Sequence, residues 1–112
     1  MNVKLRPVVF SAVQWFENGD HPDDEIRQVP YLDREGTFDS EGKVVRRFRH
    51  PNVPSDHICS NCGEKYHIHG WIDSGMDGQT VCPGQWVVDV GNRKYEVLNH
   101  GEFISKYEAI DE

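Results

Sequence analysis

A pair of cysteines followed closely by a pair of histidines constrains this chain more than any other feature. Cys59 and Cys62 lie three positions apart, with Gly63 directly behind them. His67 and His69 follow on alternate residues of the same short segment. Thiolates and imidazoles are the ligands that Zn2+ takes in closed tetrahedral sites. The spacing therefore predicts that this part of the chain folds around a zinc ion.

The two remaining ligands of this ion are not fixed by the sequence. The candidates are His67, His69 and Cys82. If residues 65–72 form a strand, both histidines lie on one face of it, and Cys82 can arrive from a neighbouring strand. The alternative for Cys82 is a small buried apolar side chain, a common role of free cysteine. His57 is expected to face solvent or to support a ligand from behind rather than to bind the metal.

Length and composition predict one small domain over residues 1–112, with a zinc knuckle at 57–82. Only 37% of the residues are hydrophobic, so the core is modest and metal binding is expected to add to the folding free energy. The three cysteines cannot all pair with one another. No secretory leader and no membrane-spanning run is recognisable in the sequence, which favours a reducing, cytosolic compartment.

The hydrophobic pattern predicts a mainly β fold, a small sheet or barrel of about five to six short strands with one or two short helices. The expected strands are 8–15, 37–38 and 43–48 as a hairpin, 65–72, 80–90 with an interruption at Pro83 and Gly84, and 94–98. A short helix is expected to open at Pro22 and to end before Pro30. A second helix is expected to run to Tyr107 from Asn99, which forms a capping box with Glu102.

The net charge of −7 opposes binding to nucleic-acid phosphates and favours a partner protein of basic character. One basic run stands against this acidic background, namely Lys43, Arg46, Arg47, Arg49 and His50. The simpler interpretation of the run is the solvated face of a strand. The alternative is that residues 43–50 belong to a zinc-containing nucleic-acid-binding module.

Five segments carry distinctive motifs: PVVFSAVQW at 7–15, CSNCG at 59–63, HGWID at 69–73, GQTVCPGQWVV at 78–88 and FISKYE at 103–108. Together they resemble a family of small proteins encoded by tailed bacteriophages and prophages. That family carries P-V-x-x-x-A-V-Q-W near its start, C-x-x-C-G, then H-G-W-I-D-T…G-x-x-V-C-P-G-D-W-I, and F-x-x-x-Y-E near its end. The resemblance covers both ends and the second half of the chain, but not residues 20–55.

The resemblance implies a phage origin, a setting in the cytoplasm of an infected bacterium, and no particular reaction. It also implies that Cys59, Cys62, His67, His69 and Cys82 belong to one unit. Because a metal with four protein ligands has no position left for an activated water, the ion is expected to be structural. The leading hypothesis is therefore a zinc-binding phage accessory protein that binds and modulates a host protein.

A second hypothesis is a metal-dependent enzyme on a small cupin-like β-barrel. The pattern His67-x-His69, with Asp73 and then Pro83-Gly84 downstream, is faintly similar to the cupin metal-binding motif. This hypothesis requires an open coordination position on the metal.

Overall fold

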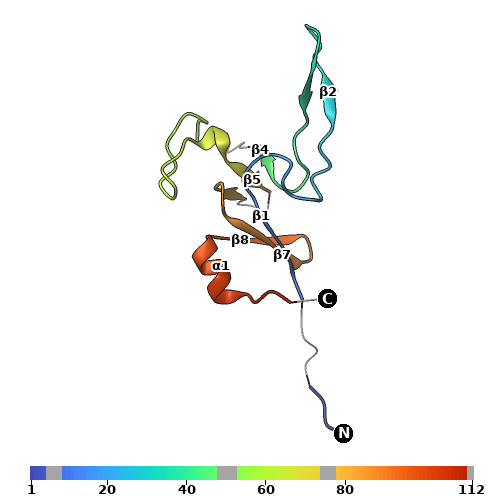
Figure 1. Ribbon diagram of the computed structural model, residues 1–112, viewed down its shortest axis with the longest axis vertical. Helices are drawn as coiled ribbons and strands as arrows, with labels where there is room; N and C mark the ends of the chain where they lie inside the picture. The colour runs from blue at the N-terminus through green and yellow to red at the C-terminus, as the bar shows by residue number, and fades with distance from the viewer. Residues whose placement is uncertain (5–8, 48–52, 74–77, 111–112) are drawn as a thin grey trace.

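Three small antiparallel sheets make up the fold within residues 1–4, 9–47, 53–73 and 78–110, which are the residues that the computed structural model describes (Figure 1). The first sheet has the order β1-β7-β8 and consists of β1 (Ser11–Gln14), β7 (Trp86–Gly91) and β8 (Lys94–Leu98). The second is a hairpin of β2 (Gln28–Pro30) and β3 (Thr37–Asp39). The third has the order β4-β5-β6 and consists of β4 (Arg46–Arg47), β5 (Gly70–Ile72) and β6 (Gln79–Val81).

The prediction of a mainly β fold is confirmed, but the number of strands is higher than expected. The described residues hold eight strands instead of five to six. The difference arises because β2 was not expected and because Pro83 and Gly84 separate two full strands, β6 and β7, rather than interrupting one.

The C-terminal part folds as its sequence predicts. β7 and β8 pair in antiparallel register through a tight turn. Asn99 and Glu102 form the predicted capping box at the start of α1 (His100–Lys106). The helix covers the first sheet, where Phe103 stacks on Trp86 with ring centroids 4.0 Å apart.

The core lies between the first and third sheets, and residues from distant parts of the chain contribute to it. Its fully buried members are Trp15, Val45, Ile72, Val81 and Val87. Each such side chain stabilises the fold by about 1.5–3 kcal/mol relative to exposure. Two sheets that would be too small to persist alone are therefore held together by one shared apolar cluster.

Two local features hold the chain leading into β4 against this core. The buried Asp24 carboxylate accepts the backbone N–H groups of Val44 at 2.7 Å and of Val45 at 2.9 Å through one oxygen. Gly70 lies so close to Val45 that a Cβ at this position would overlap the valine side chain. The position of this segment thus depends on the buried Asp24 carboxylate and on a glycine at position 70.

The short helix predicted from Pro22 is wrong. Residues 21–24 form turns and the chain continues into β2. The acidic residues suit a helix N-terminus, but Asp24 turns inward to bind the segment before β4. Glu25 has a φ of +51°, a left-handed conformation that ends any helical run at this point.

The hairpin predicted over residues 37–48 is also wrong. β3 pairs with β2 and β4 pairs with β5. The loop that closes the observed hairpin lies at 31–36, where the Tyr31 N–H donates to the carbonyl of Gly36 at 3.1 Å and Gly36 has a φ of +105°. The glycine, rather than the acidic stretch after β3, supplies the turn.

Figure 1 shows the β2–β3 hairpin projecting at the top, away from the rest of the protein. The loop that precedes the short 3-10 helix η1 (Tyr66–Ile68) forms a second projection, on the left, and α1 lies below it. Among the described residues, no helix combines the length and the apolar character needed to cross a membrane.

Candidate metal centre

A tight turn at residues 58–65 presents the first two cysteines. The Cys59 N–H donates to the carbonyl of Glu64 at 2.8 Å, and the Gly63 N–H donates to the carbonyl of Cys59 at 2.9 Å. An isolated antiparallel bridge between Ile58 and Lys65 closes the turn. Gly63 has a φ of +79°, which a glycine adopts without strain. The sequence C-x-x-C-G thus folds into a knuckle that gathers both sulfur atoms on one side.

The third sheet brings the other two ligand candidates together. Gly70 of β5 pairs with Val81 of β6 in antiparallel register. One step further along this register, His69 lies opposite Cys82. The two residues, distant in sequence, therefore stand at the same end of the sheet, next to the knuckle.

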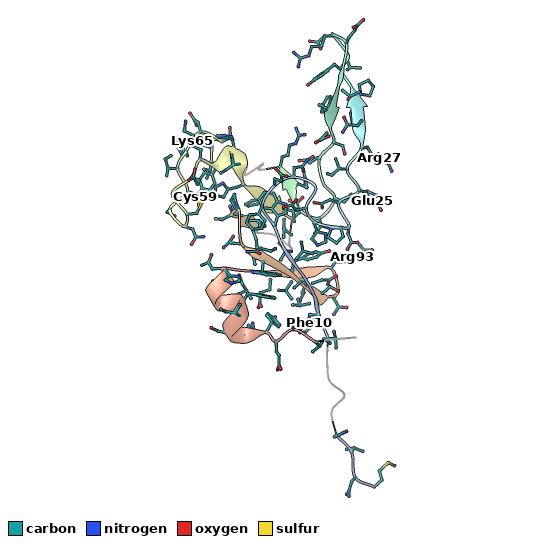
Figure 2. All side chains as sticks on the ribbon, in the orientation of Figure 1. Phe10, Glu25, Arg27, Cys59, Lys65 and Arg93 are labelled. Atoms are coloured by element: carbon teal, nitrogen blue, oxygen red, sulfur yellow. The ribbon has the colours of Figure 1, made fainter. Side chains whose placement is uncertain are left out.

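The four side chains converge on one point. The Sγ atoms of Cys59, Cys62 and Cys82 and a ring nitrogen of His69 all lie within 4.8 Å of one another. The Cys59 and Cys82 sulfurs are 3.8 Å apart, and the Cys62 sulfur is 3.0 Å from His69 Nε2. Cys59, His69 and Cys82 are buried, whereas Cys62 is exposed. This Cys3His group can hold a metal ion; Figure 2 labels Cys59 and Lys65 on the knuckle.

Neighbouring groups orient the ligands. His69 Nδ1 is 2.9 Å from the carbonyl of Lys65, which can only accept, so the ring proton is on Nδ1 and Nε2 presents its lone pair to the sulfurs. The Asn61 amide donates to the Cys82 sulfur at 3.3 Å. The Cys82 N–H donates to the side-chain oxygen of Gln85 at 2.7 Å. Such outer contacts fix ring orientation and tautomer in metal sites.

The thiols differ in their readiness to ionise. Burial raises the pKa of Cys82 to about 12, although the Asn61 amide opposes this. Burial also acts against ionisation of Cys59, but hydrogen bonds from the backbone N–H groups of Cys62 and Asn61 hold the Cys59 pKa below its ordinary value. Burial lowers the pKa of His69, which favours the neutral imidazole. Binding a cation at this site must therefore displace protons from thiols, most of all from Cys82.

Of the five residues predicted from the sequence, four meet and one does not. Cys59, Cys62, His69 and Cys82 form the cluster, whereas His67 is exposed on η1 and is not part of it. The prediction that both histidines share a face assumed a strand over 65–72. Instead, His67 lies on the 3-10 helix and His69 follows it in an extended conformation, so the two side chains do not share a strand face.

The remaining polar candidates, His57 and Asp73, are not members of the cluster. His57 is exposed, and Asp73 accepts the Trp71 indole N–H at 3.0 Å and pairs with Arg46. The supporting roles of Asn61 and Gln85 were not predicted. Their signal in the sequence is weak, since an Asn between two cysteines and a Gln after Pro-Gly are ordinary turn residues.

The basic run is largely neutralised where the structure describes it. Lys43 pairs with Glu25, and Arg46 pairs with Asp73 and with Glu41 at 3.4 Å. Arg47 donates to the backbone carbonyl of Asp39. Arg49 and His50 lie outside the described residues.

Comparisons with known proteins give no relative for this chain. No protein-family model, no curated protein and no solved structure matches it.

Proposed function

We propose that this chain is a zinc-stabilised accessory protein of a tailed phage that binds and modulates a protein of its bacterial host. The observation that carries the proposal is the Cys3His cluster, in which four protein atoms converge from a knuckle and a sheet. The phage origin and the cytoplasmic setting rest on the motifs at both ends and in the second half of the chain.

The donor set and the separation of two of its sulfur atoms fit zinc. In a tetrahedral site with Zn–S bonds of 2.3 Å, two sulfur ligands are about 3.8 Å apart. The Cys59 and Cys82 sulfurs are separated by 3.8 Å. Three thiolates and one imidazole form a common structural set for Zn2+, and the neutral, oriented His69 supplies the nitrogen that such a site requires.

The same cluster supports a structural rather than a catalytic role. Four protein ligands complete a tetrahedron, so no coordination position remains for an activated water. The metal would instead tie residues 59–62 to the ends of β5 and β6. A cupin-like enzyme would need both His67 and His69 at the metal, and His67 lies outside the cluster.

Metal analysis of the purified protein tests the zinc assignment, with one zinc per chain expected. Replacement by Co2+ should give the absorption of a tetrahedral ion with several thiolate ligands. Octahedral cobalt, or cobalt exchanging a water ligand for added azide, would contradict a closed site. For the host partner, the zinc-loaded protein should form a defined complex with one bacterial protein in cross-linking experiments, and the metal-free protein should not.

A further inference from the structure

The edge of β8 that faces away from β7 borders a polar groove. This groove, here called the β8 groove, consists of two adjoining hollows that share Gln79 and Val97 in their walls. The hollow beside the β7–β8 turn has a volume of about 690 Å3, and the one beside the knuckle about 470 Å3. Each lies within the range of about 300–1,000 Å3 that is typical of ligand sites.

Strand β8 is the last strand of its sheet, so one of its edges has no strand beside it among the described residues. The register shows which backbone groups point to that edge. The Trp15 N–H donates to the carbonyl of Gln85 at 2.8 Å. In this register the backbone N–H and C=O groups of residues 85, 87 and 89 point toward β1, and those of residues 86 and 88 point toward β8. Since Val87 lies opposite Val97 and Asp89 opposite Tyr95, these two β8 residues direct their N–H and C=O groups outward.

An independent contact supports this orientation. The Gln79 side-chain amide of β6 donates to the Tyr95 carbonyl at 2.9 Å, from the side opposite β7. Among the described residues, the N–H of Tyr95 and the N–H and C=O groups of Val97, which point away from β7, make no hydrogen bond. The β8 groove therefore offers two donors and one acceptor at the spacing of a β-ladder.

The charges of the groove differ between its ends. Arg93 and Lys94 lie in the wall near the β7–β8 turn, and Glu102 lies in the wall of the hollow beside the knuckle. Glu96 also lines the hollow beside the turn, but its carboxylate pairs with Lys106 at 2.8 Å. The rest of the lining is rich in neutral amides, including Asn61, and no other cation lines it among the described residues. Such a surface complements a chain with opposite charges at its two ends.

We propose that the β8 groove binds an extended peptide segment of a partner protein as an added antiparallel strand. This inference deepens the proposed function, on whose host-protein partner it rests. Main-chain hydrogen bonds to Tyr95 and Val97 supply the pairing, as in other cases of strand addition. An antiparallel segment runs from the Leu98 end to the Lys94 end, so its basic side chain lies near Glu102 and its acidic side chain near Arg93.

A single extended chain fits this surface better than a second copy of the protein. The groove is bounded on its far side by β6 and the knuckle, which supply Gln79, Thr80 and Asn61 to its walls. A second copy that paired through its own β8 would have to place its attached β7 and α1 in the space that β6 and the knuckle already border. The knuckle thus forms one wall of the binding surface, so a metal bound there would support partner recognition.

The experiment uses the zinc-loaded protein and two synthetic probes. The first is an end-blocked peptide of alternating threonine and valine that begins with lysine and ends with glutamate, and the second has the two charged residues exchanged. Binding is followed by NMR through the backbone N–H signals and their hydrogen exchange. The lysine-first peptide is expected to shift and protect the N–H groups of Tyr95 and Val97 and to bind more tightly than its counterpart.

A charge reversal tests the orientation of the peptide. Arg93→Glu should weaken the lysine-first peptide by about fivefold, as expected for a partly exposed charge pair, and should reduce or invert the preference between the two probes. Arg27→Glu is the matched control, since Arg27 is exposed, precedes β2 and does not line the groove, and it should change nothing; Figure 2 shows it above Arg93, with Glu25 between them.

Three results would overturn the inference. One is the absence of shifts and protection at Tyr95 and Val97 with saturating peptide, and another is equal binding of both probes. The third is a concentration-dependent dimer that protects the same two N–H groups without peptide, which would make a second copy the occupant. Any of these can occur with one zinc still bound per chain, whereas a failure of the proposed function appears first as missing zinc.

Discussion

The sharpest prediction compares two histidines that are nearly adjacent in the sequence. His69 is 2% exposed, and its Nε2 lies 3.0 Å from the Cys62 sulfur, whereas His67 is exposed on η1 outside the cluster. His69→Ala removes one of four ligands and leaves a buried gap at the end of β5. His67→Ala removes a solvent-facing ring. The two substitutions are chemically identical, so their difference reports the loss of the candidate ligand together with the loss of a buried ring, and zinc removal separates these two effects.

The expected magnitude follows from linkage between zinc binding and folding. If loss of the imidazole weakens zinc binding a thousandfold, the folded state loses about 4 kcal/mol of stabilisation at a zinc concentration that saturates the unmodified protein. For a domain of this size, 1 kcal/mol corresponds to about 4 °C, so the melting temperature should fall by roughly 15 °C. His67→Ala, as an ordinary surface substitution, should change stability by no more than about 0.5 kcal/mol.

Thermal unfolding at fixed zinc concentration, together with competition against a chromophoric chelator, measures both quantities. Excess chelator serves as the internal check, because it should lower the melting temperature of the unmodified protein nearly to that of His69→Ala. Equal effects of the two substitutions would refute the assignment of His69 as the ligand. An unchanged melting temperature after zinc removal would refute the structural role of the metal.

Three further predictions concern the surroundings of the site and the sheets. Asn61→Ala removes the amide that donates to the Cys82 sulfur and should weaken zinc binding by about 10–100-fold in the same competition assay, with all four ligands still present. An unchanged zinc affinity would show that this hydrogen bond does not support metal binding. Asp24→Ala leaves two backbone N–H groups without their acceptor and should lower the unfolding free energy measured in urea by about 3 kcal/mol. Asp24→Asn keeps an acceptor oxygen and should lower it less, so equal losses for the two variants would contradict this account. The hydrogen bond from Lys106 lowers the pKa of Glu96 in the folded state. The stability that Glu96 contributes is therefore present above the ordinary glutamate pKa of about 4.3 and is lost as the pH falls through the lowered pKa. The difference in unfolding free energy between the protein and Glu96→Gln should vanish at low pH, and a difference that persists there would contradict this account.

The motifs that fold locally could be predicted from the sequence. The C-x-x-C-G turn specifies its own knuckle because its hydrogen bonds join neighbouring residues and Gly63 takes the left-handed conformation that the turn requires. The capping box at Asn99 and the turn between β7 and β8 are equally local. In each case short-range geometry and residue type suffice, so Cys59 and Cys62 could be assigned to a metal without knowledge of the fold.

The choice among the other ligands depended on contacts between distant residues. The 3-10 helix at 66–68 decided that His69 rather than His67 joins the cluster, and Cys82 joins it because β5 and β6 pair in the register that sets Cys82 opposite His69. The failed helix after Pro22 has the same cause, since Asp24 is recruited by the strand segment at 44–45 rather than by its own neighbours. The sequence by itself determined that the C-x-x-C-G knuckle forms and that the fold is mainly β. Only the tertiary structure decided which side chains complete the site, because strand register and burial are set by pairings that no local pattern records.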